Sequence, residues 1–232
     1  MRRLTMENEA TLFAWPQQAK FGRTLNKERF YAGARNNRKL KRLFTEQVKR
    51  VTWQYKLAPL TLNVPSTDDV LEIEVIQIDA TADQLDPAIL LAIDRAVPKQ
   101  TIHEIHAGGR VCQTMAYKRA SESDKSAVVI GHYMTTPFVT EEHPRRPLPV
   151  SLNLGKLYAS LLRSMIDLPP RKDESLREHL DRHQQIITAR REAERITKKM
   201  HAERQLNRKV EWNSELRRVN SEIARLTDTQ SP

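Results

Sequence analysis

The last quarter of the chain contains the stretch that most restricts its fold, because it lacks residues that break helices. No Gly or Pro lies between Asp173 and Thr227, and charged side chains are frequent throughout. The apolar residues near its end are spaced four, three, four and three apart, as along the seam of a coiled coil: Trp212, Leu216, Val219, Ile223 and Leu226. We therefore predict a C-terminal helical, coiled-coil extension over residues 171–232.

The seam does not keep one register through this extension. Upstream, a second run has the same spacing: Ala189, Ala193, Ile196 and Met200. The step from Met200 to Leu206 breaks the register. The break disfavours one uninterrupted parallel coiled coil and favours an antiparallel helical hairpin, or a helix that lies along a partner or along the rest of the chain. Ala and Asn at seam positions predict weak self-association, and Asn213 would fix the register at a cost in stability.

The extension has two competing functional interpretations. Residues 190–209 are strongly basic, so direct contact with nucleic acid is one of them, since uncompensated Lys and Arg bind phosphates. Acidic residues interrupt this run, however, and residues four apart, such as Glu194 and Lys198, form ordinary surface pairs on a solvated helix. We therefore favour binding of a partner protein, and predict the following partner-binding residues: Leu206, Val210, Trp212, Asn213, Leu216, Val219 and Ile223.

The positive charge of the chain is concentrated at its N-terminal end. The formal net charge is +10, and residues 1–60 carry 14 Lys and Arg against 4 Asp and Glu. Residues 61–170 carry 10 against 14, and residues 171–232 carry 15 against 11. Such asymmetry predicts one end that faces a polyanion and a more neutral core.

The basic segment itself reads as a helix that ends at Pro59. In "NNRKLKRLFTEQVKRVTWQYKLAP" the apolar residues form one stripe at helical spacing, with cations on the other sides. Trp53 would stack on a base and the cations would follow the phosphate backbone. The alternative is that Trp53 and Tyr55 pack on a sheet and the charges are only solvated. The predicted nucleic-acid-binding residues are Arg38, Lys41, Arg42, Lys49, Arg50, Trp53 and Lys56.

The middle of the chain alternates between strand and helix patterns. Strands are predicted over 60–64 and 71–79, followed by a helix with Asp86 as its N-cap and a hairpin that turns at Gly108–Gly109. A further strand and a helix over 148–170 follow. This order predicts an α+β core, residues 1–170, with a mixed, mostly antiparallel sheet. We expect a ferredoxin-like β-α-β-β arrangement with helices on one face.

Few residues suggest catalysis. Glu72, Glu74, Asp79 and Lys118 are the candidates for a metal-dependent nuclease site, but no acidic-x-Lys motif follows on the hairpin strands. His179 and His183 lie four apart on a predicted helix, where surface pairing is a simpler interpretation than zinc binding. We therefore predict no catalytic residues, no metal and no cofactor.

The cellular location follows from three features. The single cysteine, Cys112, excludes a disulfide framework within the chain and is expected to be a small buried residue. No apolar run approaches the length of a membrane span, and the start of the sequence does not resemble a signal peptide. The expected location is the cytoplasm.

Several strings of the sequence resemble a bacterial and archaeal family described as a domain of unknown function. They are "NKERFY", "LKRLFTEQVKRVTWQYKLAPLTLNV", "EIEVIQI", "LLAIDRAVP" and "RQLNRKVEWNSELRRV", in this order, and the resemblance runs from Phe13 to Leu226. It implies an association with restriction-modification and anti-phage gene islands, beside DNA methyltransferases and restriction-type helicases. It carries over no catalytic residue.

We therefore expect a non-enzymatic accessory subunit of such a system. It would bind a helicase or DNA methyltransferase partner through the C-terminal helix, and DNA through the N-terminal basic helix. A metal-dependent nuclease of the same system and a stand-alone nucleic-acid-binding protein are the two alternatives.

Overall fold

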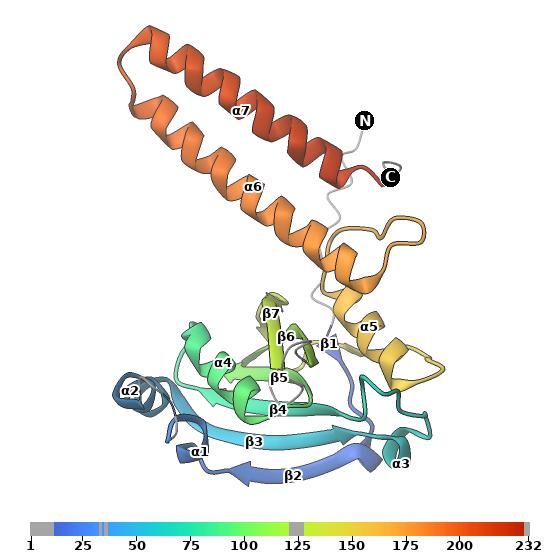
Figure 1. The fold of residues 1–232 in the computed structure, drawn as a ribbon. Coiled ribbons are helices and arrows are strands. Elements are labelled where there is room, and N and C mark those ends of the chain that lie inside the picture. The colour runs from blue at the N-terminus through green and yellow to red at the C-terminus, as the bar shows by residue number, and fades with distance from the viewer. Residues whose placement is uncertain (1–11, 33, 35–36, 121–127, 230–232) are drawn as a thin grey trace. The chain divides into compact units, whose positions relative to one another are not determined.

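The computed structural model describes residues 12–32, 34, 37–120 and 128–229 (Figure 1). They divide into two compact units, one ending at Met165 and one beginning at Ile166. The first is an α+β unit and the second is helical.

The α+β unit is built on a sheet whose strands lie side by side in chain order. They are β2 (Lys20–Leu25), β3 (Val48–Leu57), β4 (Ile73–Ala80), β5 (Gln100–Ala107), β6 (Arg110–Ala120) and β7 (Val128–Thr135), with β8 (Val139–Thr140) paired to β6. Within this sheet, β4 and β5 are parallel and the other pairs are antiparallel. A separate parallel pair joins β1 (Leu12–Phe13) to β9 (Arg145–Arg146). The predicted α+β class with a mostly antiparallel mixed sheet is confirmed.

The predicted ferredoxin-like arrangement is not confirmed. The crossover helix α4 (Pro87–Ala96) connects β4 to β5, and these two strands are direct neighbours. A split β-α-β unit would instead place another strand between them. The predicted start of α4 is confirmed, because the backbone N–H of Ala88 donates a 2.9 Å hydrogen bond to the Asp86 side chain, with Pro87 at the first helical position.

Three helices contribute to one apolar core with the sheet. They are α1 (Glu28–Tyr31), α2 (Asn37–Gln47) and α4. Buried Phe30, Phe44 and Ile93 from these helices pack in the same cluster as Val51 and Ile78 from β3 and β4. Beyond this core lie the 3-10 turn η1 (Gln17–Ala19), the short helix α3 (Pro59–Leu62), and α5 (Leu154–Ser164), which contacts β6. The core thus holds α2 against the sheet and leaves its other side to solvent.

The predicted basic helix is wrong over its second half. Helix α2 ends at Gln47, and residues from Val48 onward form β3. The strand has two irregularities in its pairing with β4, between Val48 and Arg50 and between Trp53 and Tyr55. The predicted strand over 60–64 is also wrong, because Pro59 begins α3 and Asn63 ends it with a left-handed backbone (φ 54°).

The second unit is an antiparallel helical hairpin of α6 (Leu176–Ala202) and α7 (Leu206–Thr227). Ser175 begins α6 with a capping box, in which its hydroxyl accepts from the Glu178 N–H and the Glu178 carboxylate accepts from the Ser175 N–H. The connection at 203–205 coincides with the predicted break in the register, and the hairpin is one of the alternatives left open by the sequence. A coiled coil with another chain is not confirmed. None of the helices in the described ranges is long and apolar enough to cross a membrane.

Candidate functional site

The exposed side of α2 carries the first group of predicted nucleic-acid-binding residues. Arg38, Lys41 and Arg42 are exposed, while Leu43 and Phe44 face the core. The Arg42 guanidinium lies 3.9 Å from the Glu46 carboxylate, so its charge is partly compensated. Among the described residues, Arg38 and Lys41 form no ion pair. These two cations are therefore the best placed on α2 to meet an external anion.

The remaining predicted residues lie on β3 and differ in their surroundings. Lys49 is exposed at the start of the strand and forms no ion pair within the described part of the chain. Arg50 is bound to the Asp79 carboxylate, with the donating nitrogens 2.8 Å away. Only Lys49 extends the uncompensated charge of α2 onto the strand.

Trp53 and Lys56 belong to a packed cluster on the sheet. The Trp53 ring is half-buried and lies 4.3 Å from the Phe21 ring, and Lys56 Nζ lies 5.8 Å above the Trp53 ring. Lys56 Nζ also lies 2.6 Å from the Glu72 carboxylate. Trp53 thus packs on the sheet, which was the alternative to base stacking in the sequence analysis. Base stacking by Trp53 stays a prediction.

The predicted partner-binding residues of α7 fall into two groups. Trp212, Leu216, Val219 and Ile223 are half-buried, and the Trp212 ring is covered by Lys199 of α6, whose Nζ lies 4.9 Å away. At the tip, Leu206 is 74% exposed and Val210 is 62% exposed. Asn213 is exposed beside them, and together with Met200, His201 and Lys209 these three line a depression of about 340 Å³. The seam therefore serves the hairpin itself, and the tip is where apolar surface remains.

A network of buried polar residues lies between α4 and the sheet. Asp94 of α4 accepts hydrogen bonds from Lys118 Nζ (3.2 Å) and from the Tyr133 hydroxyl (2.5 Å), and its Oδ1 lies 3.1 Å from His103 Nε2. Lys118 Nζ also donates to the Val97 carbonyl at 2.6 Å. One signal for this network is present in the sequence: Asp94 follows the apolar run from Ile89 to Ile93 in α4, where a charged side chain needs a buried partner.

Opposite charges stabilise each other within the buried network. Burial by itself raises the pKa of Asp94, but His103 and Lys118 lower it more, so the pKa lies well below its ordinary value. Burial lowers the pKa of Lys118, and Asp94 opposes that shift. Both side chains are only 1% exposed, so their charges are compensated inside the fold rather than by water.

Comparison with known proteins places the chain in a family. The sequence model of a family described as a domain of unknown function, DUF4391, matches residues 13–223. The chain belongs to this family. Neither the curated proteins nor the solved structures with which it was compared include a match.

The nuclease alternative gains no support from the geometry of this DUF4391 chain. Along β4, alternate residues face opposite sides of the sheet, so Asp79 lies on the other face from Glu74 and Lys118. Glu72 is paired with Lys56, and burial together with the charge of Glu72 raises the pKa of Glu74 to about 8. The described ranges contain no group of three or more His, Cys, Asp and Glu side chains that could hold a metal ion.

Cys112 and His179, one of the two histidines considered as zinc ligands, are both buried in the fold. Cys112 is buried as expected, and burial raises the pKa of its thiol to about 12. His179 is buried and its Nε2 lies 2.8 Å from the Leu168 carbonyl. In this DUF4391 chain the histidine therefore ties the segment before α6 to the helix.

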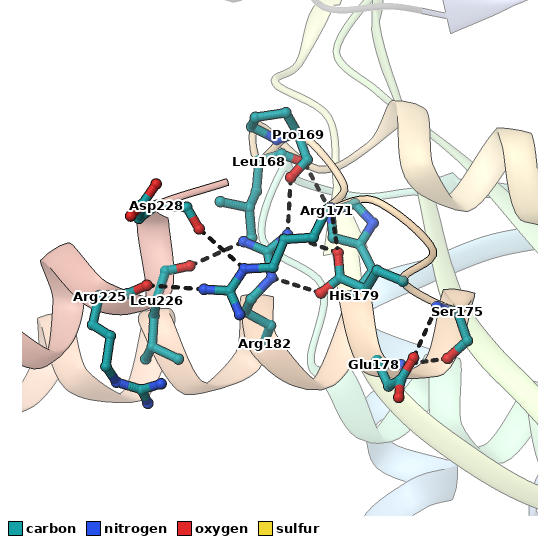
Figure 2. A network of polar contacts seen from close by, with 11 residues as sticks. Leu168, Pro169, Arg171, Ser175, Glu178, His179, Arg182, Arg225, Leu226 and Asp228 are labelled. Carbon is teal, nitrogen blue, oxygen red and sulfur yellow. Dashed lines mark hydrogen bonds and ion pairs between the residues drawn. The ribbon is translucent and has the colours of Figure 1, made fainter. Parts of the chain in front are cut away.

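The base of the hairpin is held by two arginines (Figure 2). Arg182 of α6 is 5% exposed and forms a bidentate pair with Glu174 at 2.7 and 2.8 Å. It also donates to the carbonyls of Leu226 and Pro169, both at 2.9 Å. Arg171 donates to the carbonyls of Arg225 and Asp228 at 2.9 and 3.0 Å. The last carbonyls of a helix have no partner within that helix. At the end of α7 they are capped by guanidinium groups of Arg171 and Arg182, which come from the beginning of the unit in sequence.

Proposed function

We propose that this DUF4391 protein is a non-enzymatic accessory subunit of a bacterial DNA-processing or anti-phage defence system. Its α+β unit would contact a nucleic-acid backbone, and its helical hairpin would hold a larger partner such as a helicase or a DNA methyltransferase. The resemblance to proteins encoded beside such enzymes suggests the setting.

The observation that carries the nucleic-acid part is the uncompensated charge on the outer side of α2 and at the start of β3. Arg38, Lys41 and Lys49 are exposed and, within the described ranges, have no carboxylate partner. Cations of this kind release counterions from nucleic acid when they bind phosphates, whereas Arg42 and Arg50 would first have to leave a carboxylate. Phosphate contact fixes position and carries no sequence information, so we expect little sequence preference.

The hairpin part rests on the contrast between its seam and its tip. The seam residues of α7 are half-buried within the hairpin, so they are engaged before any partner arrives. Leu206 and Val210 are exposed apolar side chains, and the polar residues His201, Lys209 and Asn213 line the same depression. Apolar anchors surrounded by polar residues are typical of protein–protein contacts.

The nucleic-acid contact is tested by fluorescence anisotropy with a labelled duplex of about 20 base pairs at increasing salt. The wild-type affinity should fall steeply with salt. Arg38→Ala, Lys41→Ala and Lys49→Ala combined should reduce the slope of log K against log salt by about 2 to 3, since each phosphate contact contributes about 0.9. The matched control combines Arg177→Ala, Arg195→Ala and Arg225→Ala, because these three guanidinium groups already lie beside the carboxylates of Asp181, Glu192 and Glu222. An equal effect of the control, or a salt-independent affinity, contradicts the proposal.

Two further measurements separate the alternatives. Incubation of the same duplex with Mg²⁺ or Mn²⁺ should leave it intact, and cleavage that is lost with Glu74→Gln would favour the nuclease. Co-expression with a helicase or methyltransferase from the neighbouring genes should give a complex that Leu206→Glu with Val210→Glu disrupts. Asn207→Glu, an exposed polar position on the same turn, is the control for added charge. A complex that survives the double change shows that the tip does not hold the partner.

A further inference from the structure

A groove of about 580 Å³ lies between α1, α2 and α4. Apolar side chains line its inside, including Leu40 and Leu43 of α2 and Leu91 of α4. Leu43 is buried, but Leu40 and Leu91 are only half-buried. The groove therefore presents apolar surface that the core beneath it does not fully cover.

The charged residues that line this groove in the described part of the chain all have the same sign. Arg29 of α1, Lys39 of α2 and Arg95 of α4 line it and are exposed, and no described Asp or Glu lines it. Each of the three helices thus contributes one cation. The groove combines an apolar inside with a positive edge.

The groove is separate from the surface proposed to meet nucleic acid. Successive residues of a helix are rotated by about 100°, so Lys39 lies on the side of α2 that includes Leu43. Arg38 and Lys41 point away from that side, toward solvent. One helix therefore carries two basic surfaces with different surroundings, one apolar and one not.

We infer that this groove binds an acidic amphipathic helix of a partner protein. The length of α4, which forms one wall of the groove, sets the length of the bound helix. Helix α4 has 10 residues and is about 15 Å long, which suits about three turns of a bound helix. Helices that bind in grooves insert apolar side chains spaced three and four apart, and here these would contact Leu40 and Leu91. Glu or Asp on the flanks of that helix would lie against Arg29, Lys39 and Arg95.

Two other occupants fit the groove less well. A nucleic-acid backbone would satisfy the cations but has no apolar side chain for the leucines. A second copy of this chain, related by twofold symmetry, would bring the same cations together, because such an interface places the same patch on both sides. The inference does not depend on nucleic-acid binding by Arg38, Lys41 and Lys49.

The test is a selection with the full-length protein from a displayed library of about 14-residue peptides. Each peptide has Leu fixed at positions i, i+3, i+4 and i+7 and random residues elsewhere. We expect Glu and Asp to be enriched on both flanks of the leucines. The best peptide, labelled with a fluorophore, is then titrated against wild-type protein and variants by anisotropy.

The variants distinguish the groove from general charge attraction. Arg29→Glu with Lys39→Glu should raise the Kd at least about tenfold, which corresponds to about 1.4 kcal/mol. Leu91→Glu should weaken binding similarly. Lys39→Glu alone should also weaken binding, and Lys41→Glu is its matched control, because each change reverses one charge on opposite sides of α2. Lys41→Glu should leave peptide affinity within about twofold while weakening DNA binding. Circular dichroism establishes that each variant is folded.

Several results would overturn the inference. Selection of no peptide, or of peptides without acidic enrichment, shows that the groove does not recognise this class of ligand. An equal loss of affinity with Lys41→Glu shows that binding follows net charge. Competition by duplex DNA that disappears with Leu91→Glu assigns the groove to nucleic acid. A dimer that Leu91→Glu dissociates assigns it to a second copy.

Discussion

Replacing Asp94 by Ala should cost the α+β unit a large part of its stability. The substitution leaves the Lys118 ammonium, which is 1% exposed, with only neutral partners such as the Val97 carbonyl. Removing one member of a buried ion pair costs about 3 to 5 kcal/mol, because the other charge stays buried without compensation. The Tyr133 hydroxyl also loses its acceptor, at a cost of about 1 kcal/mol. The sum of about 4 to 6 kcal/mol compares with about 5 to 15 kcal/mol for the whole stability of a typical domain.

Urea unfolding followed by tryptophan fluorescence measures this loss. The helical unit contains Trp212, so the measurement uses a Trp212→Phe background, in which Trp15 and Trp53 report only on the α+β unit. The Asp94→Ala variant should also become more stable as the pH rises. Burial lowers the pKa of Lys118 in the folded chain below its unfolded value of about 10.4. At a pH between the folded and the unfolded pKa, the unfolded state binds more protons, so stability increases with pH.

A double-mutant cycle decides whether the cost comes from the ion pair. Lys118→Met alone should also destabilise the unit, because it leaves Asp94 charged and buried. Asp94→Ala with Lys118→Met should lose less than the sum of the two single losses, by about 2 kcal/mol or more. Losses that add to within about 0.5 kcal/mol, or a loss below about 1 kcal/mol for Asp94→Ala alone, would refute the reasoning.

Three further outcomes are expected. Glu74→Gln should gain stability relative to the wild type as the pH rises from about 4.3 to about 8. Over this range the carboxyl of Glu74 keeps its proton in the folded chain and loses it in the unfolded chain, which destabilises only the wild type. Urea unfolding of both proteins at about pH 4.3 and at about pH 8 measures the difference. Arg182→Met should lower the melting temperature of the hairpin, measured by circular dichroism. The hydrogen bond from Arg182 holds the pKa of Glu174 at about 2, so the stabilisation that it gives the wild type is lost as the pH falls toward this value. The melting temperature of the variant should therefore fall less than that of the wild type when the solution is acidified. Ile196→Ala, at a fully buried position on α6, should cost the hairpin about 2 to 5 kcal/mol, measured through Trp212 fluorescence.

The periodicity of the sequence predicted the elements whose pattern was regular. Helix α4 and the β5–β6 hairpin follow from the N-cap at Asp86 and from Gly108–Gly109, whose positive φ angles the turn requires. The break in the register between Met200 and Leu206 coincides with the connection between α6 and α7, and the hairpin is one of the alternatives that the sequence left open. In each of these places the local signal and the tertiary packing agree.

Strand β3 was misread because its two pairing irregularities change the spacing of its apolar residues. In a regular strand, residues of one face are two apart. The register with β4 places Val48, Val51, Trp53 and Lys56 on one face, at spacings of three, two and three. An extra residue at a β-bulge produces such steps, and steps of three resemble a helix. Strand β2 has little apolar pattern of its own, and its place follows only from pairing with β3.

For the candidate surfaces, the sequence shows which side chains are charged but not which of them are paired. It lists cations without showing that Arg50 is bound to Asp79 while Lys49 is free of any such partner among the described residues. The groove cations come from two helices that follow each other in the chain, α1 and α2, and from α4, which lies much further along it. Only the fold brings Arg29, Lys39 and Arg95 to one place.

The closed base of the hairpin makes this unit a candidate module for transplantation. Arg171 and Asp228 are 57 residues apart in the chain but are joined by a hydrogen bond, so the segment enters and leaves its fold at one point. A segment with adjacent ends can be inserted into a surface loop of a host protein without stretching the host. Its tip would then stand about 40 Å from the insertion point, given the 27 residues of α6. The hairpin would act as a rod of fixed length that carries Leu206 and Val210 at its far end.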